Sequence, residues 1–159
     1  MTRGFNVSYK ILLRMLTVIT SLFEKDINKL IEEIGLFKSE EDIWKIKEGV
    51  SNSAGNLSLH LVGNLNHFIG ATLGNSGYVR KRDKEFSEKN IPRTQLIEAL
   101  NSTVSVIKQT LAALPEEDLK KDFPVAINQK IISTEYMLVY LLNHFNYHLG
   151  QVNYLRRLI

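Results

Sequence analysis

Two histidines near the end of the chain, His144 and His148, lie four residues apart. In a helix this spacing places both imidazoles on one face, one turn above each other, so that both can reach the same metal ion. The zinc-binding HExxH motif has the same spacing, but its glutamate base is replaced here by Phe145. A pair alone is weak evidence for a metal, because buried histidines often serve only as hydrogen-bonded core residues.

A third histidine, His60, lies beside Leu57 and Leu61 on the apolar face of an earlier segment. Histidines inside a helical bundle need a partner, since an unpaired polar group is costly to bury. His67 follows seven residues later and returns to almost the same face of a helix. It is an alternative third ligand, although we favour a place for it in the core or at the rim of a pocket.

Two amides accompany these histidines about one turn further along the chain. Asn64 follows His60 by four residues, and Gln151 follows His148 by three. Each amide could hydrogen-bond a ligand or a bound water in a pocket. Each is also compatible with a polar helix face whose amide is satisfied locally, and the sequence does not separate these two interpretations.

The elements that must position these side chains are helices. Apolar residues recur at three- and four-residue steps in four long segments, the first of which has apolar residues from Ile11 and Leu12 onward. A short helix at Glu40–Lys47 should follow Ser39, which begins a capping box with Asp42. No segment has a comparable strand pattern. The four long helices are predicted at Tyr9–Ile34, Gly55–Leu73, Thr94–Leu114 and Thr134–Leu158.

These helices are separated by two long connections, Tyr78–Arg93 and Glu116–Ile131. Four long helices with two long links are typical of a four-helix bundle with crossover connections. The length of 159 residues suits one domain, and 44% hydrophobic residues are enough for a core. We therefore predict an all-α protein in which residues 1–159 form a single bundle domain.

The composition excludes several kinds of chemistry. The chain has no cysteine, which excludes disulfides, thiolate metal ligands, iron–sulfur clusters and a cysteine nucleophile. The net charge of +3 is too small to imply nucleic-acid binding, and the basic residues at 80–84 are expected to be solvated. The apolar stretch Ile11–Phe23 contains Arg14 and is too short to span a membrane. We expect a cytoplasmic protein without a signal peptide.

Three segments of the chain resemble the DinB-like (YfiT-like) family of metalloenzymes. They are Asn56–Leu65, with the pattern HLxGN, Arg82–Phe86, with the pattern RDxEF, and His144–Gln151. The resemblance covers most of the chain, and it is greatest to an uncharacterised subgroup related to the bacillithiol- and mycothiol-dependent S-transferases.

The resemblance implies a fold, a ligand set and partners. The fold is an up-up-down-down helical bundle, often found as a homodimer. One histidine from the second long helix and two from the last bind a divalent metal ion in the family. Carried over by motif, these ligands are His60, His144 and His148, with zinc, nickel, iron or manganese as the ion. A low-molecular-weight thiol and an electrophilic small molecule would be the partners.

The segment Arg82–Phe86 has no role that the resemblance supplies. Arg82 could form an ion pair with Asp83 or Glu85, and Phe86 could cover the end of the bundle. We favour this structural role for the segment over substrate binding.

A metal ion held by three neutral imidazoles keeps its full charge and an open coordination position, which is the pattern of catalytic sites. Such an ion lowers the pKa of a bound water or deprotonates a thiol. The hypotheses are therefore a thiol S-transferase, a metal-dependent hydrolase, or a bundle that binds metal or a small ligand without catalysis. Hydrolysis is disfavoured because no acidic residue lies near the histidines in sequence.

Overall fold

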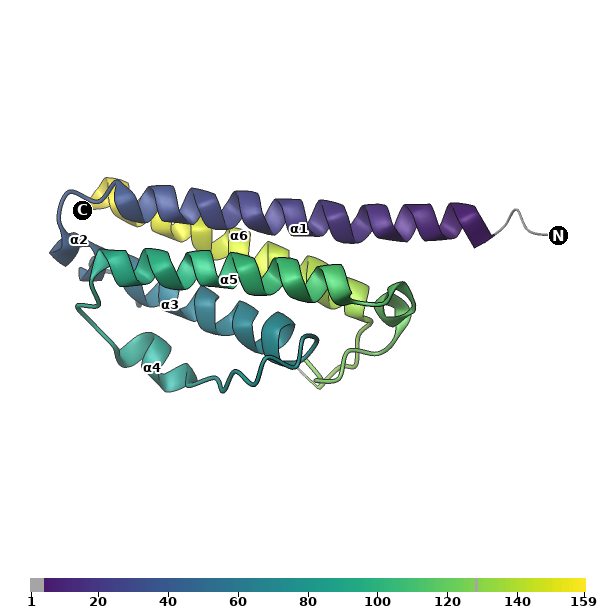
Figure 1. Ribbon diagram of the computed structural model, residues 1–159. Coiled ribbons are helices and arrows are strands. Elements are labelled where there is room, and N and C mark those ends of the chain that lie inside the picture. Colours follow the sequence, from purple (N-terminus) through teal and green to yellow (C-terminus); the bar gives the residue numbers. More distant parts are fainter. Residues whose placement is uncertain (1–4, 128) are drawn as a thin grey trace.

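The computed structural model describes residues 5–127 and 129–159, with side chains from Met15 onward. Ile11 and Leu12, the first residues of the predicted apolar pattern, lie outside the described side chains. The described chain contains four long helices, as predicted (Figure 1). They are α1 (Phe5–Gly35), α3 (Ala54–Leu65), α5 (Arg93–Ala113) and α6 (Thr134–Leu158).

Four short helical elements join the long helices. They are α2 (Glu40–Trp44), the π-helix η1 (Asn66–Ala71), α4 (Arg82–Ser87) and the 3-10 helix η2 (Glu116–Lys120). The described residues form no strand, and only two isolated bridges occur, between Asp122 and Ser133 and between Ile127 and Lys130. The all-α prediction is confirmed. The link Tyr78–Arg93, which we expected to be a loop, contains α4.

The helix ends agree with the capping residues in the sequence. The predicted capping box of α2 is present, because Ser39 accepts from the backbone of Asp42 while the Asp42 carboxylate accepts from the backbone of Ser39. Ser53 and Ser133 begin α3 and α6 in the same way, each accepting a backbone N–H of the first turn. These side chains satisfy N–H groups that a helix start leaves without a partner.

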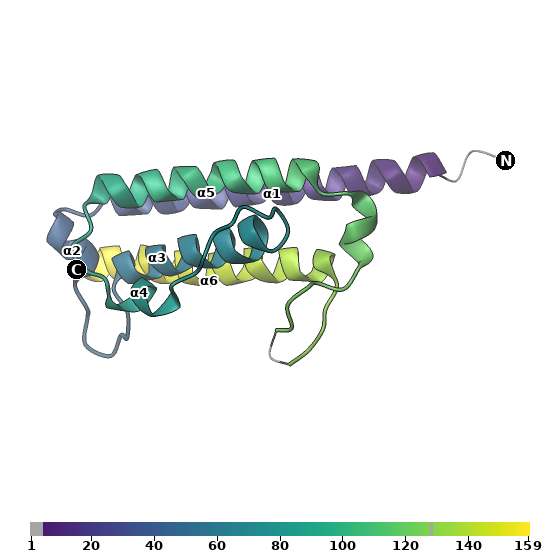
Figure 2. The same cartoon turned by 60° about the horizontal axis from the view of Figure 1, so that its bottom comes forward.

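The order of helix directions differs from the predicted up-up-down-down arrangement. Contacts such as Asp26–Asn146 and Glu33–Asn153 make α1 and α6 parallel. Arg93, at the start of α5, donates to carbonyls at the end of α1, so α5 runs against α1. The order is therefore up-down-down-up (Figures 1 and 2). Among the described residues, the connection from η1 to α5 returns along the bundle, whereas α1 and α3 are joined at one end and α5 and α6 at the other.

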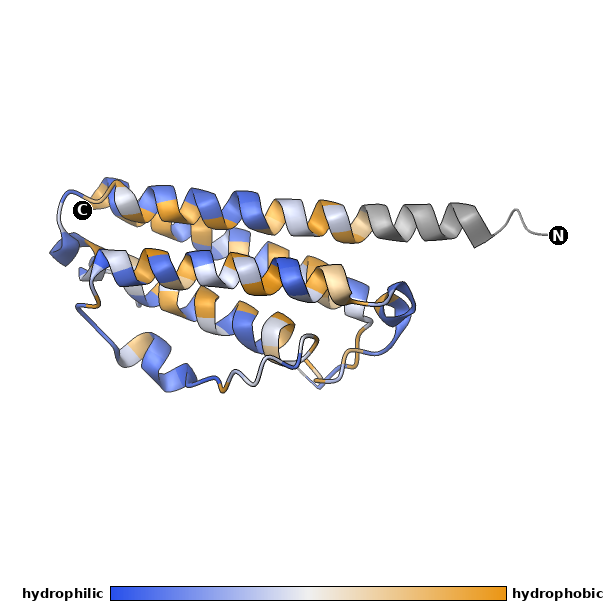
Figure 3. Ribbon diagram, viewed as in Figure 1, coloured by the Kyte–Doolittle hydropathy of each residue, from blue (hydrophilic) through white to orange (hydrophobic). Residues whose placement is uncertain are grey.

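The core lies between the four long helices, and α1 packs against α5 and α6 while α3 packs against the same two from the other side. Each helix ribbon carries both hydrophobic and hydrophilic residues (Figure 3). The buried ones recur at three- and four-residue steps, which places them on one face. On α1 and α3 they are Leu16, Ile19, Phe23, Ile27, Leu30, Ile34, Ala54, Leu57, Leu61 and Leu65.

Two buried carboxylates connect α1 to the back of α6, which is the face of that helix with Asn146 and Asn153. The Asn146 amide donates to Asp26 over 2.6 Å, and seven residues further along both helices the Asn153 amide donates to Glu33 over 2.8 Å. Arg156 also donates to Glu33. Burial acts to raise the pKa of Glu33, but the hydrogen bonds from Arg156 and Asn153 outweigh it and leave that pKa below its usual value. Because these contacts are seven residues apart on both helices, they fix the axial position of α6 relative to α1.

The predicted second helix does not remain an α-helix to Leu73. From Asn66 it becomes a π-helix, in which the N–H groups of Thr72 and Gly74 donate to carbonyls five residues earlier. This part of the chain lies against α5, where the Asn66 amide donates to Thr103 over 2.8 Å. The wider turn rotates the following residues relative to those of α3.

A membrane span requires a helix that is both long and apolar. Among the described residues, no helix combines the length and the hydropathy that such a span needs.

Candidate metal centre

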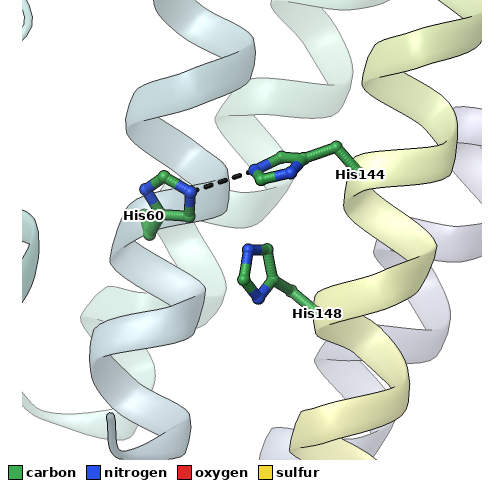
Figure 4. A group of neighbouring side chains, drawn as sticks. All are labelled: His60, His144 and His148. Atoms are coloured by element: carbon green, nitrogen blue, oxygen red, sulfur yellow. Dashed lines mark hydrogen bonds between the residues drawn. The ribbon is translucent and has the colours of Figure 1, made fainter. Parts of the chain in front are cut away.

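Three histidine side chains from two antiparallel helices meet on one side of the bundle core. His60 comes from α3, and His144 and His148 come from α6 (Figure 4). One nitrogen from each ring lies within 4.8 Å of the others, and the Nε2 atoms of His60 and His144 are 3.0 Å apart. His60 is buried and the other two are half-buried. The side chains that the spacing and the family motifs singled out are therefore brought together.

The outer nitrogen of His60 is bound by a buried carboxylate. Its Nδ1 lies 2.9 Å from Glu85 Oε2, and both side chains are at least nine-tenths buried. A carboxylate only accepts, so Nδ1 carries the hydrogen and Nε2 keeps its lone pair toward the other histidines. A carboxylate that accepts from the outer nitrogen of a histidine is common where that histidine binds a metal ion.

Arg80 neutralises the carboxylate that orients His60. Its Nε and one terminal nitrogen donate to the two oxygens of Glu85 over 2.7 and 2.8 Å. Such two-point pairing also fixes the plane of the carboxylate. The guanidinium lies 3.3 Å from His60 Nδ1, but both groups are donors once that nitrogen bonds Glu85, so this contact is electrostatic.

Gln151 has the corresponding role behind His148. Its Oε1 lies 2.7 Å from Nδ1 of His148. Because a side-chain carbonyl accepts, Nδ1 of His148 carries the hydrogen and Nε2 is the nitrogen with a free lone pair. The Oε1 atom of Gln151 is thus satisfied by a histidine of the cluster, and a role of Gln151 toward a ligand stays a prediction.

The protonation states suit a cation. Burial is the main cause that lowers the pKa of His60, and it acts against the raising effect of Glu85. Burial, together with the other two histidines, lowers the pKa of His144 to about 4. Burial acts to raise the pKa of Glu85, but the hydrogen bonds from Arg80 and His60 keep it below its usual value. Near neutral pH His60 and His144 are neutral, as metal ligands must be.

The spacing of the donor atoms also fits one ion. Two nitrogens bound to a tetrahedral zinc ion at roughly 2.0–2.1 Å are about 3.4 Å apart. The nitrogens of the cluster lie between 3.0 Å and 4.8 Å from one another, so small ring rotations would bring them to a shared ion. No carboxylate belongs to the cluster among the described residues. The three imidazoles could therefore hold a divalent ion while leaving a coordination position open.

Two small features of α3 allow Glu85 to reach His60. A Cβ atom on Gly63 would lie 2.1 Å from Glu85 Oε1, so only a glycine leaves room for the carboxylate. The Asn56 amide donates to the backbone carbonyls of Glu85 and Glu88 over 3.1 and 2.9 Å. Together they hold α4 against α3 (Figure 2). The segment Asn56–Asn64 thus positions both His60 and the carboxylate behind it.

The other predicted pocket residues are not in the histidine cluster. Asn64 is buried, and no described group hydrogen-bonds its Oδ1. His67 lies in η1, where its ring contacts Phe68 with ring centroids 4.7 Å apart. Burial, with the charge of Arg80, lowers the pKa of His67. His60, and not His67, is the histidine that meets His144 and His148.

The predicted ion pair of Arg82 with Asp83 or Glu85 is wrong. Glu85 is bound by Arg80 and His60, and the Arg82 guanidinium lies 5.5 Å from the ring centre of Phe86. Phe86 does not cover the bundle end, since its ring lies beside His60 with centroids 5.1 Å apart. The sequence predicted neither the role of Glu85 nor that of Arg80, because both act across a turn of the chain. The only signal was the inclusion of Glu85 in the RDxEF pattern.

Comparisons with known proteins agree with this fold. The family described as "Protein of unknown function (DUF1572)" matches residues 12–159. No curated protein matches. The crystal structure of a DinB-like protein from Bacillus cereus is similar, with a TM-score of 0.61 and 17% identity over 92% of this chain and 89% of that one. At this identity the likeness extends to the fold alone, and the predicted DinB-like fold is confirmed.

The stability of the metal-free protein should depend on pH through His144. In the unfolded chain this imidazole binds a proton near the ordinary histidine pKa of 6.5, whereas folded His144 resists protonation down to a pKa of about 4. The free energy of unfolding should therefore fall as the pH is lowered through this window. Urea unfolding with a chelator present measures it. His144→Gln should give a flatter pH profile, and an unchanged profile would contradict the assignment. The stabilisation from Glu33 and Glu85, whose pKa values are lowered, is lost only at lower pH.

The close approach of Glu85 to α3 predicts that Gly63→Ala is destabilising. The added methyl group would overlap the carboxylate, so either Glu85 or α4 must move. We expect a loss of about 1–3 kcal/mol in urea unfolding, as for other overpacked sites. Gly35→Ala is the matched control, because no atom outside the adjacent residues and the helix's own backbone lies within 4 Å of its Cβ position. That variant should be neutral or slightly stabilising, and equal effects of the two would refute the steric account.

Proposed function

Because the chain belongs to the DUF1572 family, whose function is unknown, we propose its function from the histidine cluster: His60, His144 and His148 bind one divalent metal ion that activates a small thiol for transfer to an electrophile. The observation that carries the proposal is the convergence of three imidazoles, two of which have their outer nitrogens bound by Glu85 and Gln151. This leaves the Nε2 atoms of His60 and His148 for the ion.

The donor set determines what the ion would supply. When bound by three neutral imidazoles, a divalent ion keeps its full charge and an open position at which the pKa of a thiol falls. The protein's own residues maintain these conditions. Arg80 neutralises Glu85, which fixes His60, so the ligands themselves add no negative charge to the ion. Imidazole donors suit zinc, nickel and iron, and manganese is a further candidate.

The position of Glu85 favours thiol activation over hydrolysis. A hydrolase needs a base that can take a proton from water beside the ion. Both oxygens of Glu85 are already bound by Arg80, and one of them also by His60, on the side of the imidazole opposite Nε2. No other carboxylate lies in the cluster among the described residues. A thiol is acidic enough to lose its proton at a metal without such a base. Since the chain has no cysteine, the thiol must be a separate small molecule.

The metal proposal predicts that the wild type, loaded with zinc, nickel, manganese or iron and then dialysed, retains about one ion per chain. His144→Ala and His148→Ala should each retain below about 0.1, because two imidazoles rarely hold an ion against dialysis. Metal analysis measures the content, and circular dichroism checks the fold. His67→Ala is the matched control, since His67 is the histidine outside the cluster, and it should retain the metal.

Glu85→Gln gives a graded version of the same test. The amide still accepts from His60 but no longer neutralises Arg80, so affinity should fall about 10–100-fold rather than vanish. A wild type that retains under about 0.1 ion per chain with all four metals would end the proposal for this site. Equal loss of metal in His67→Ala would mean that the cluster is not the ligand set.

The thiol proposal predicts a spectroscopic change in the cobalt-substituted protein. Adding 2-mercaptoethanol should produce a sulfur-to-cobalt charge-transfer band in the near ultraviolet, because a thiolate occupies the open position. Ethylene glycol, which has a hydroxyl in place of the thiol, should produce none. If cobalt binds and no thiol changes the spectrum, thiol activation is wrong and metal binding alone stands. Turnover of an activated ester by the same protein would then favour the hydrolase.

A further inference from the structure

A cavity beside the histidine cluster has no role in the function proposed so far. It has a volume of about 480 Å³ and extends from His148 toward the end of α6, beneath the loop that precedes α3. This volume lies within the range of about 300–1,000 Å³ that is typical of small-molecule sites. The lining residues are Gly49, Val50, Ser51, Asn52, Leu57, Tyr147, His148, Gln151, Tyr154, Leu155 and Leu158.

The cavity joins the metal ligands directly. His148 forms part of its wall, and so does Gln151, whose carbonyl fixes the ring of His148. Leu57, which precedes His60 by one turn of α3, forms the floor with Leu155, and both leucines are buried. A molecule that reached the open position of an ion from this side would therefore place the rest of its body in the cavity.

The wall carries aromatic and apolar groups that the bundle leaves exposed. Tyr147 and Tyr154 are 65% and 68% exposed, and Leu158 is 54% exposed. Tyrosine rings supply flat apolar surface together with a polar end, which suits contacts to a ring-bearing ligand. The exposed groups lie around a hollow next to a metal ligand, and this placement favours a small molecule over a flat protein partner.

The wall contains no lysine, arginine, aspartate or glutamate. Its polar groups are the hydroxyls of Ser51 and the two tyrosines and the amides of Asn52 and Gln151. In the part of the chain that the structure describes, Ser51, Asn52, Tyr147 and Tyr154 have no side-chain hydrogen bond. Lys47 reaches the outer rim, where its ammonium group donates to the Leu158 carbonyl over 3.4 Å. The cavity can thus hydrogen-bond a ligand but offers no counter-charge within its wall.

We propose that this cavity binds the uncharged, ring-bearing body of the thiol whose sulfur occupies the metal centre beside His148. The inference rests on the proposed function and adds the substrate class: a neutral aromatic or similarly flat thiol rather than one whose body carries carboxylates. A carboxylate inside the cavity would lose water without gaining a cation from the wall, since Lys47 reaches only the outer rim, and such a loss is unfavourable.

Two matched thiols test the substrate class. Against the cobalt-substituted protein, 4-mercaptobenzamide should bind at least about fivefold more tightly than 4-mercaptobenzoate, because a distal charge is poorly solvated in the cavity. Leu158→Lys places an ammonium group in the wall and should reduce this ratio at least about threefold. Comparing the ratio between variants cancels the intrinsic difference between the two thiols. Tyr136→Lys is the control, since Tyr136 is 61% exposed on α6 and lies outside the cavity.

Removal of an aromatic wall is an independent test. Tyr154→Ala should weaken both aromatic thiols at least about fivefold through lost ring contact, while leaving the affinity for 2-mercaptoethanol unchanged. Tyr136→Ala should change neither. Because both tyrosines are exposed, neither substitution should affect folding.

The outcomes separate this inference from the proposed function. If 2-mercaptoethanol gives the charge-transfer band but the thiol ratio is near one in every variant, the cavity assignment is wrong and thiol activation stands. If no thiol gives the band, thiol activation is wrong. If NMR then also shows no preference of the protein for benzamide over benzoate, the cavity assignment is wrong as well. A dimer that Tyr154→Ala dissociates, with no small probe bound, would show that the surface joins two copies of the chain instead.

Discussion

The buried carboxylate of Glu85 is the group on which the geometry of the site depends. A buried charge is tolerated only when it is paired and hydrogen-bonded, and Glu85 meets this condition through Arg80 and His60. The pair requires the long connection between η1 and α5 to return across α3, because both Arg80 and Glu85 belong to that connection. Gly63 and Asn56 make the approach possible. The connection between η1 and α5 therefore determines which nitrogen of His60 faces the other two histidines.

The helices and the histidine pair could be predicted from the sequence because they depend on local patterns. Apolar spacing located all four long helices, and the capping box at Ser39 located the start of α2. The spacing of His144 and His148 places both on one face wherever α6 lies. The association with His60 came from a family resemblance, and no local pattern contains it. The same resemblance implied the metal ion, whose binding by the three histidines stays part of the proposal.

The remaining features depend on contacts between distant segments. The up-down-down-up order follows from which connection crosses the bundle, and connection length alone does not reveal that. The π-helix after Leu65 packs against α5, where Asn66 bonds Thr103, and no local pattern in the sequence indicates it. From the sequence, Glu85 was expected only as a possible ion-pair partner of Arg82 within its own segment. Its burial depends on Arg80, five residues earlier, and on Gly63 of α3. Nothing in the sequence indicates that these three residues lie together.

The two carboxylate contacts between α1 and the back of α6 divide the last helix into two functional surfaces. Asp26 with Asn146 and Glu33 with Asn153 repeat at a seven-residue interval, so a shift of α6 by one turn would break both. The face of α6 with Asn146 and Asn153 thus sets its alignment, and the opposite face carries His144 and His148. Residues 144, 148 and 151 could therefore be replaced by other side chains without loss of the contacts that position α6 along α1.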